Sequence, residues 1–438
     1  MPDNTIEWGQ GAVNNTNDWG KAKANSTNNF GAVYDDSPSG DTNIAGGTGV
    51  ALSISYSASA FCEDASDPTP TVTGNVGAGT YSSTAGIIFA DSGTNTNSAT
   101  GVVDISASTP SATPYVITYT DTNSATATFN LTINALDNAA FSYTYSSYAQ
   151  NFPDPTPTIT GLAGGTFSAG SGLVFVDSGS NTGSSTGEID LSASTIASYT
   201  ITYTTTGTCP NTSTQTVGIT AELAQVNNVY SMEFDGVNDF INLGNSDDLS
   251  FSTNTTNDSP FSISGWVKPD DTTTFRFIRK GPFSLGTGYE YIVGTNANNN
   301  LNFLIYDSNN NRIGTSTSAA ITSTDWQHWV VTYDGTGKVT GTNSGMKTYI
   351  NGSLVATGDA NSGTYTGMTN GSANLNIGIA FGNSGFSYAD GKMDEIGIFN
   401  VELTAQEVQS IYLATETGKT ADLDDLTTPP VKWYRMGN

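Results

Sequence analysis

Two carboxylates on one strand face are the arrangement with which retaining glycosidases cleave sugar polymers, one acting as nucleophile and the other as general acid. The nearest match in this 438-residue chain is Glu233-Phe-Asp-Gly-Val-Asn238, which ends in an amide where a Glu-x-Asp-x-x-Glu phrase carries a carboxylate. His328 is the only histidine and stands between Trp326 and Trp329 in a strand-like phrase, which favours a structural role. The chain has no phosphate-binding loop, CxxC pair or metalloprotease motif. We therefore expect no enzyme.

Aromatic side chains on loops offer a different chemistry, because a ring stacks on the flat face of a sugar while nearby asparagines bond its hydroxyls. Such rings lie in glycine- and asparagine-rich segments toward the C-terminus: Phe283, Tyr289, Phe381, Phe386 and Tyr388. The alternative for each ring is a place in the core or at a contact between subunits. We expect some of them to form a glycan-binding surface.

Composition indicates which elements must position these side chains. Gly, Ser, Thr and Asn separate short runs in which Val, Ile, Thr, Tyr and Phe alternate with polar residues. This pattern predicts an all-β, turn-rich protein. No run of 18 consecutive apolar residues occurs, so we expect no membrane insertion.

The charge balance narrows the class of partner. Thirteen basic against forty acidic residues give a net charge of −27, and no basic residue lies between Lys23 and Lys268. Nucleic-acid binding needs basic stripes that neutralise phosphates, so we expect no nucleic-acid partner. The simplest role for the acidity is to keep a repetitive β surface soluble.

The middle of the chain is a tandem duplication. Asp-Pro-Thr-Pro-Thr-Val-Thr-Gly at 67–74 returns as Asp-Pro-Thr-Pro-Thr-Ile-Thr-Gly at 154–161, and Tyr115-Val-Ile-Thr-Tyr119 returns as Tyr199-Thr-Ile-Thr-Tyr203. We assign the copies to residues 47–136 and 137–222. Six or seven short alternating strands per copy favour an immunoglobulin-like sandwich.

The two copies resemble repeats in surface proteins of the Bacteroidetes lineage, but their cysteines differ from the pattern of those repeats. There, an early cysteine pairs with one in the last hairpin. Copy one keeps Cys62 but has Ala125 at the late position, whereas copy two keeps Cys209 but has Ala149 at the early one. A disulfide needs Cα atoms within about 7 Å, and the cysteines belong to different modules. We therefore expect two unpaired thiols, which suits assembly in a reducing cytoplasm.

Five phrases in the last two fifths of the chain carry a second resemblance. They are Tyr230-Ser-Met-Glu-Phe-Asp-Gly236, Phe261-Ser-Ile-Ser-Gly-Trp-Val-Lys-Pro269, Trp326-Gln-His-Trp-Val-Val-Thr-Tyr-Asp-Gly335, Thr348-Tyr-Ile-Asn-Gly352 and Met393-Asp-Glu-Ile-Gly-Ile-Phe-Asn400. A short helical segment follows at 404–412. Their order resembles the laminin-G-like, concanavalin A-like family in its bacterial and phage form. The resemblance implies a jelly roll over 223–416 that binds glycans or proteins outside cells.

The same resemblance implies calcium as a cofactor. In similar jelly rolls, a calcium ion commonly bridges the Asp-Gly turn of the opening phrase and an acid of the closing phrase, through oxygen ligands. The matching positions are Asp235 and Asp394, with Asp239 and Glu395 nearby. The alternative is that Asp235 caps its own turn and Asp394 ends a strand.

Residues 1–46 contain a finer repeat. Trp8-Gly9, Trp19-Gly20 and Phe30-Gly31 recur at intervals of eleven, and each glycine permits a tight bend after an aromatic anchor. So short a segment cannot bury three rings by itself. It resembles the N-terminal anchoring arms of phage structural proteins, which implies contacts with other virion proteins. The alternative is a flexible leader with accidental spacing.

An arm, two sandwiches, a jelly roll and a tail at 417–438 together predict a bacteriophage fibre or decoration protein of the head or tail. We expect a homo-oligomer, such as a trimer, whose jelly roll binds a host surface glycan. The chain opens without a signal-peptide pattern, which favours assembly in the host cytoplasm, release by lysis and display on the virion surface. The alternative is an exported adhesin of a Bacteroidetes-like bacterium; a polysaccharide hydrolase is less favoured.

Overall fold

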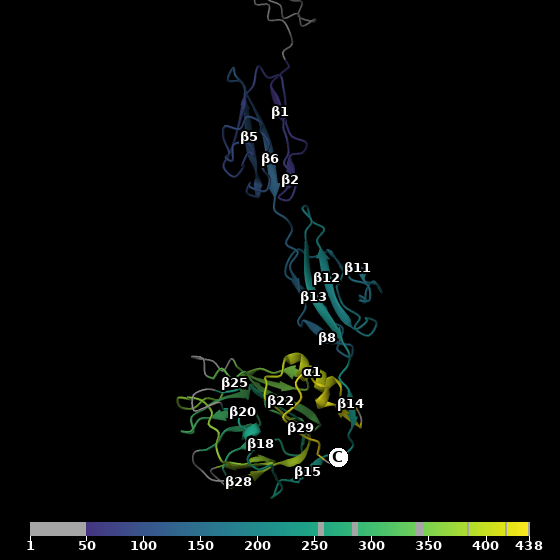
Figure 1. Ribbon diagram of the computed structural model, residues 1–438, viewed down its shortest axis with the longest axis vertical. Helices are drawn as coiled ribbons and strands as arrows, with labels where there is room; N and C mark the ends of the chain where they lie inside the picture. The colour runs from purple at the N-terminus through teal and green to yellow at the C-terminus, as the bar shows by residue number, and fades with distance from the viewer. Residues whose placement is uncertain are drawn as a thin grey trace, which may run out of the picture. The chain divides into compact units, whose positions relative to one another are not determined.

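The computed structural model describes residues 50–252, 258–282, 288–337, 345–382, 385–416 and 418–436. Over these ranges the regular secondary structure is almost all β, with one α-helix (Figure 1), which confirms the all-β class. The predicted arm at 1–46, with its three aromatic-glycine pairs, lies outside the described residues. Within the described ranges, no helix has the length and apolar character needed to cross a membrane.

The contacts divide the chain into two compact units. The first contains the described residues up to Ala140 together with Thr160–Gly165 and Thr204–Thr212, and the second contains Phe141–Ile159, Thr166–Tyr203 and the chain from Ser213 onward. Three short segments of the second repeat, at 137–140, 160–165 and 204–212, are therefore grouped with the first unit, and the module boundary predicted after residue 136 stays a prediction.

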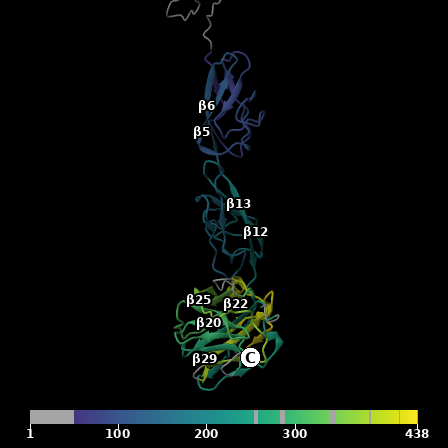
Figure 2. The same ribbon diagram turned by 90° about the vertical axis from the view of Figure 1, so that its left-hand side faces the viewer.

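The first repeat forms a four-stranded and a two-stranded sheet. Its strands are β1 (Ser53–Ser55), β2 (Ala60–Cys62), β3 (Thr71–Thr73), β4 (Thr80–Ser83), β5 (Ser111–Thr120) and β6 (Thr126–Asn134). The larger sheet has the order β2-β6-β5-β4, and β1 pairs with β3. The long strands β5 and β6 lie side by side in both Figure 1 and Figure 2. Their alternate residues, including Ile117 and Leu131, are fully buried in the core of this repeat.

The second repeat has the same connectivity. Its strands are β7 (Phe141–Ser142), β8 (Ser147–Ala149), β9 (Thr158–Ile159), β10 (Thr166–Ala169), β11 (Thr182–Ser184), β12 (Ala197–Thr204) and β13 (Thr212–Thr220). The sheet β8-β13-β12-β10-β11 and the pair β7-β9 reproduce the first repeat with one added edge strand. In both copies the second strand pairs in parallel with the last, as Ala60 with Thr132 and Tyr148 with Ile219. The two repeats thus share their strand pairing as well as their sequence. The immunoglobulin-like assignment stays an interpretation.

The repeated aspartates hold equivalent loops. Asp67 Oδ1 accepts a hydrogen bond from the Ile105 backbone N–H at 2.9 Å, and Asp154 Oδ1 accepts one from the Leu191 N–H at 2.9 Å. Side-chain acceptors of this kind satisfy backbone donors that no strand partner reaches. The Asp-Pro-Thr-Pro phrase recurs because both copies need the same bond.

We expect Asp67→Ala and Asp154→Ala to destabilise their own repeats equally, each by about 1 kcal/mol, because each removes one equivalent hydrogen bond. Chemical denaturation followed by far-ultraviolet circular dichroism would measure the loss. Asp64→Ala, at an exposed position of the first repeat, is the control. A loss in one repeat without a comparable loss in the other would contradict the equivalence of the two loops.

The expectation of two unpaired thiols is wrong. Cys62 and Cys209 form a disulfide with their Cα atoms 5.5 Å apart, and no described cysteine is unpaired. Cys209 lies in the segment Thr204–Thr212, which belongs to the first compact unit, as Cys62 does. Each cysteine therefore lacks a partner within its own repeat and forms its disulfide with the cysteine of the other repeat.

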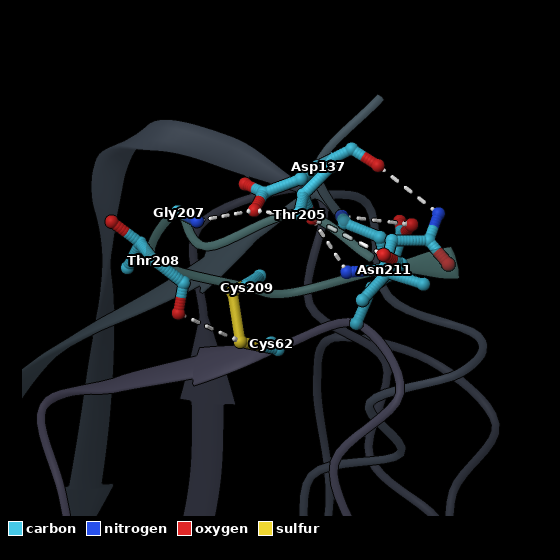
Figure 3. The surroundings of a disulfide bond; sticks show 9 residues. Cys62, Asp137, Thr205, Gly207, Thr208, Cys209 and Asn211 are labelled. Atoms are coloured by element: carbon cyan, nitrogen blue, oxygen red, sulfur yellow. Dashed lines mark hydrogen bonds between the residues drawn. A yellow bond between two sulfur atoms is a disulfide. The ribbon is translucent and has the colours of Figure 1, made fainter. Parts of the chain in front are cut away.

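A hydrogen-bond network fixes the loop that carries Cys209 (Figure 3). Asp137 Oδ2 accepts from Thr205 Oγ1 and from the Gly207 N–H, both at 2.9 Å. Asn211 Nδ2 donates to the Asp137 carbonyl at 3.0 Å, and the Asn211 N–H donates to Thr205 Oγ1 at 2.8 Å. Asp137 therefore orders the loop from both of its sides and holds Cys209 in place.

The C-terminal part forms two seven-stranded sheets. The first has the order β15-β29-β17-β22-β23-β24 with β31 beside β29, and the second has the order β16-β26-β18-β19-β20-β21-β25. The strands of the first sheet are β15 (Met232–Asp235), β17 (Phe261–Pro269), β22 (Gln327–Tyr333), β23 (Met346–Ile350), β24 (Ser353–Leu354), β29 (Asp390–Phe399) and β31 (Lys432–Tyr434). Those of the second are β16 (Ile241–Asn242), β18 (Arg276–Lys280), β19 (Tyr291–Thr295), β20 (Leu301–Tyr306), β21 (Arg312–Thr317), β25 (Thr357–Asp359) and β26 (Leu375–Ile377).

Alternate residues of the two sheets pack into one core. Ile263 and Trp329 from the first sheet and Phe277 and Phe303 from the second are members of the same buried cluster. Short additional pairs join β14 (Gln225–Asn227) to β30 (Lys419–Ala421) and β27 (Ile379–Gly382) to β28 (Gly385–Tyr388). Two strands of the predicted tail, β30 and β31, thus pair with strands of this domain.

The single helix, α1 (Ala405–Leu413), begins at a capping box. Thr404 accepts a hydrogen bond from the Glu407 N–H, and the Glu407 side chain accepts one from the Thr404 N–H. Val408 and Ile411 are buried against Val330 and Phe399 in a second cluster outside the main core. The helix predicted at 404–412 is confirmed.

Candidate functional site

A cleft of about 510 Å³ lies beside β28 and the start of β29. Its lining combines aromatic rings with carboxylates and hydroxyls: Phe275, Phe386 and Tyr388 with Asp271, Asp390, Thr273 and Ser387. The hairpin β27–β28 brings Phe386 and Tyr388 to the cleft, because residues two apart on a strand point to the same side. Two of the five rings predicted to bind glycan therefore come together.

The Phe386 ring of the cleft is accessible, whereas Phe275 is buried, and hydrogen bonds order the strands and loops around them. Phe386 is 50% exposed, and its ring centroid lies 6.1 Å from that of Tyr388. Arg276 Nε donates a hydrogen bond to Ser387 Oγ at 3.1 Å, which ties β28 to β18. Asp271 Oδ1 accepts from the Thr273 N–H at 2.7 Å, which orders the opposite rim. The arrangement offers an apolar shelf next to hydrogen-bond acceptors.

The other predicted rings do not join this cleft. Tyr289 is buried, with its ring centroid 5.3 Å from that of Tyr306 and with the Arg279 guanidinium 5.0 Å above it. Its ring therefore packs inside the domain, which corrects the expectation of an exposed sugar shelf there. Phe283 and the Phe381 side chain lie outside the described residues.

The two aspartates predicted to share calcium are not neighbours. Strand pairing places Asp235 opposite Asp390, and Asp394 lies four residues further along β29, about 13 Å at the rise of a strand. Asp235 Oδ1 instead accepts from the Val237 and Asn238 N–H groups at 2.9 and 3.3 Å, and these bonds lower the pKa of Asp235. The turn-capping alternative describes Asp235, and a single ion bridging Asp235 and Asp394 does not fit this register.

Asp394 is a buried structural acid. Its oxygens accept from Asn228 Nδ2 at 2.9 Å, from the Glu395 N–H at 2.8 Å and from the Met436 N–H at 3.1 Å. Burial raises the pKa of Asp394 to about 7. In the described ranges, no cluster of three or more histidine, cysteine, aspartate or glutamate side chains is arranged to hold a metal ion. Calcium as a cofactor stays a prediction.

Glu395 marks an irregularity in β29. Its φ of 49° is left-handed for a non-glycine residue, and the register with β17 shifts between Ser264 and Trp266. A bulge of this kind turns consecutive side chains toward the same side. Glu395 is held there by Trp433 Nε1 at 2.5 Å and Thr420 Oγ1 at 3.0 Å, both as donors.

His328 lies in the interior of the domain, in agreement with the structural role that its position between Trp326 and Trp329 favours. It is fully buried, and its Nε2 is 2.8 Å from Ser264 Oγ. Burial lowers the pKa of His328 to about 3, so the imidazole is neutral near pH 7. Its ring stacks on Trp266, with centroids 5.1 Å apart. Since Ser264 is also buried, the serine-histidine pair does not reach a substrate from the surface.

A second pocket, of about 680 Å³, was missed from the sequence. Three lysines and three large aromatic residues contribute to its wall: Lys268, Lys392, Lys419, Tyr230, Trp266 and Trp326. These residues are scattered over almost 190 positions of the sequence, so no local motif joins them. The one sequence signal that could have drawn attention to these lysines is the scarcity of basic residues in this chain.

The two seven-stranded sheets packed on one core form a jelly roll. Residues 243–409 match the family described as the concanavalin A-like lectin/glucanases superfamily, which confirms the resemblance for this part of the chain. No curated protein matches the chain.

Three solved structures are similar to part of this chain. A putative carbohydrate binding protein from Bacteroides ovatus is 14% identical, over 68% of this chain and 89% of that chain, with a TM-score of 0.31. The native heptameric SAP-like pentraxin from Limulus polyphemus is 17% identical, over 40% and 81%, with a TM-score of 0.27. The Ruminococcus gnavus IT-sialidase CBM40 bound to alpha2,3 sialyllactose is 12% identical, over 44% and 100%, with a TM-score of 0.31. These values are too low to transfer any residue or function to this chain.

Proposed function

We propose that the jelly roll binds a neutral glycan in the cleft of Phe386 and Tyr388 and does not cleave it. The observation that carries this proposal is the half-exposed Phe386 ring at the mouth of a cleft that also contains Asp271 and Asp390. A half-exposed ring beside hydrogen-bond acceptors can pack against the apolar face of a bound sugar. Few convergent polar groups beside an apolar wall are typical of ligand sites.

The chemistry of this lining suits a sugar. The C–H face of a pyranose can stack on Phe386, while its hydroxyls donate to the carboxylate oxygens of Asp271 and Asp390. An ionised carboxylate accepts hydrogen bonds but donates none, so Asp271 and Asp390 favour a ligand with many hydroxyl donors. They also disfavour an anionic ligand, so the site selects a neutral glycan.

We expect Phe386→Ala to weaken glycan binding by the full-length chain about tenfold, equivalent to ~1.4 kcal/mol, because it removes the stacking face. A panel of neutral soluble polysaccharides, titrated by calorimetry, would identify the ligand and then measure the variant. Leu354→Ala, at another exposed apolar position on β24, is the control. Unchanged binding in Phe386→Ala, or release of oligosaccharides by the wild-type chain, would refute the proposal.

We further propose that the chain acts outside cells as an adhesive component of a phage particle. The Cys62–Cys209 disulfide supports an oxidising setting, although not the reducing assembly expected from unpaired thiols. The alternative is an adhesin of a bacterial surface. Mass spectrometry of purified particles and of host cell envelopes would separate the two, since the virion proposal requires the chain in the particles.

A further inference from the structure

The 680 Å³ pocket of the jelly roll has a wall of lysine side chains. Strand β17 contributes Lys268, β29 contributes Lys392 and β30 contributes Lys419. Only 13 basic residues occur in the chain, against 40 acidic ones. A pocket lined by three of the basic residues therefore differs in charge from the molecule as a whole, which is acidic, and favours an anion locally.

Two of the lysines face each other. Lys268 and Lys392 are direct cross-strand partners in the register of β17 and β29. Like charges in this position destabilise a sheet, so their placement calls for a compensating anion. Their neighbouring acids compensate weakly: Asp270 is 3.7 Å from Lys268 Nζ, Glu233 is 3.4 Å from Lys392 Nζ, and both acids are more than half exposed. The third lysine, Lys419, is bound to Glu416 at 2.6 Å.

Two acids line this pocket, Asp394 and Glu416, and neither supplies that anion, because Glu416 is bound to Lys419. Asp394 lines the pocket, but it is 7% exposed and already accepts the three hydrogen bonds described above. Its oxygens are therefore engaged within the domain. The two facing lysines are paired only with the exposed acids Asp270 and Glu233, so an anionic group that enters from solvent can compete for them.

Aromatic rings form the rest of the wall. Trp266 is held by stacking on His328 and on Tyr412, with centroids 5.1 and 5.8 Å apart. Trp326 is 39% exposed and Tyr230 is 63% exposed. A fixed indole beside two solvent-facing rings provides flat apolar surface, which a bare inorganic anion would not use.

We propose that this pocket is a second binding site, for an acidic saccharide. The ring of the sugar packs on Trp266 and Trp326, and its carboxylate or sulfate group lies between Lys268 and Lys392. The Phe386 cleft has the opposite charge, because Asp271 and Asp390 line it. The two sites therefore select different saccharides and can be tested separately.

The test uses the full-length chain with four probes: a heparin octasaccharide, a tetragalacturonate, a neutral cello-oligosaccharide and sodium sulfate. Calorimetric titration should show binding of at least one acidic oligosaccharide that weakens as salt rises. Lys268→Gln and Lys392→Gln should each weaken it about tenfold, as expected for the loss of one charge-assisted hydrogen bond. Trp326→Ala should also weaken it, because the stacking surface is lost.

Matched controls separate this proposal from the neutral-glycan site. Lys347→Gln removes an exposed lysine of β23 that does not line the pocket, and Phe386→Ala disables the other cleft; neither should change binding of the acidic probe. No binding of either acidic oligosaccharide, or binding that survives both lysine substitutions, would overturn the proposal. Sulfate binding as tightly as the oligosaccharide would also overturn it, because the site would then recognise only an anion.

Discussion

Replacing Glu290 by glutamine is expected to lower the free energy of unfolding of the jelly roll by about 3–5 kcal/mol, because it leaves a buried cation without its counter-ion. Lys280 Nζ lies 2.9 Å from Glu290 Oε1, and the two side chains are 0% and 1% exposed. Burial raises the pKa of Glu290 even though the Lys280 charge opposes that shift. Desolvation is therefore already large, and the pair is tolerated only while both members are present.

The surroundings of this ion pair leave no route for relaxation. Lys280 Nζ also donates to Asn245 Oδ1 at 2.6 Å and to the Ala373 carbonyl at 3.1 Å. Glu290 accepts from Ser250 Oγ at 2.8 Å and from the Gly371 N–H at 2.9 Å. The pair thus connects β18 to neighbouring loops, and removing its negative charge weakens the hydrogen bonds that Glu290 accepts.

Denaturation followed by tryptophan fluorescence would measure the effect, because residues 50–222 contain no tryptophan, three of the six lie at 223–416 and Trp433 lies on β31, which pairs with β29. Glu402→Gln is the matched control. Its partner Lys347 is 2.6 Å away, but the side chains are 26% and 42% exposed, so the expected loss is about 0–1 kcal/mol. Equal losses for the two variants would show that burial of the Lys280–Glu290 pair does not govern its contribution.

The strands were predictable from sequence because their signal is local. The phrases at 261–269, 326–335 and 393–400 alternate in burial or carry buried runs, and β17, β22 and β29 coincide with them within three residues. The capping box of Thr404 and Glu407 likewise depends only on residues close together in the sequence. Turn chemistry and side-chain periodicity act over a few residues, so these features do not depend on the rest of the fold.

The site was predictable only in part, because its geometry depends on register and on distant segments. Phe386 and Tyr388 were singled out because they lie in a glycine- and asparagine-rich segment expected to be a loop, whereas the structure places both on β28. The Asp235–Asp394 pair failed because pairing sets Asp235 against Asp390, and a sequence alone does not give that register. The facing lysines 268 and 392 were missed for the same reason, since their proximity exists only across β17 and β29.

The disulfide offers the second large effect. Cys62→Ala and Cys209→Ala are each expected to destabilise the first compact unit by about 2–4 kcal/mol, since the bond closes a separation of 147 residues in the unfolded chain. Far-ultraviolet circular dichroism during denaturation would measure the loss. A thiol assay on denatured, unreduced wild-type protein should find no reactive cysteine, and each single variant should expose one.

The double variant distinguishes a bond from two separate cysteines. If Cys62 and Cys209 act only through their disulfide, either substitution already breaks it, so Cys62→Ala with Cys209→Ala should cost little more than one substitution alone. Two independent thiols would instead give additive losses, and two titratable thiols in the wild-type chain would contradict the bond directly. Cys209 is 1% exposed and Cys62 lies nearer the surface, so some excess cost at Cys209 is expected from packing. The strong coupling between the two substitutions, rather than the size of either loss, is therefore the decisive result.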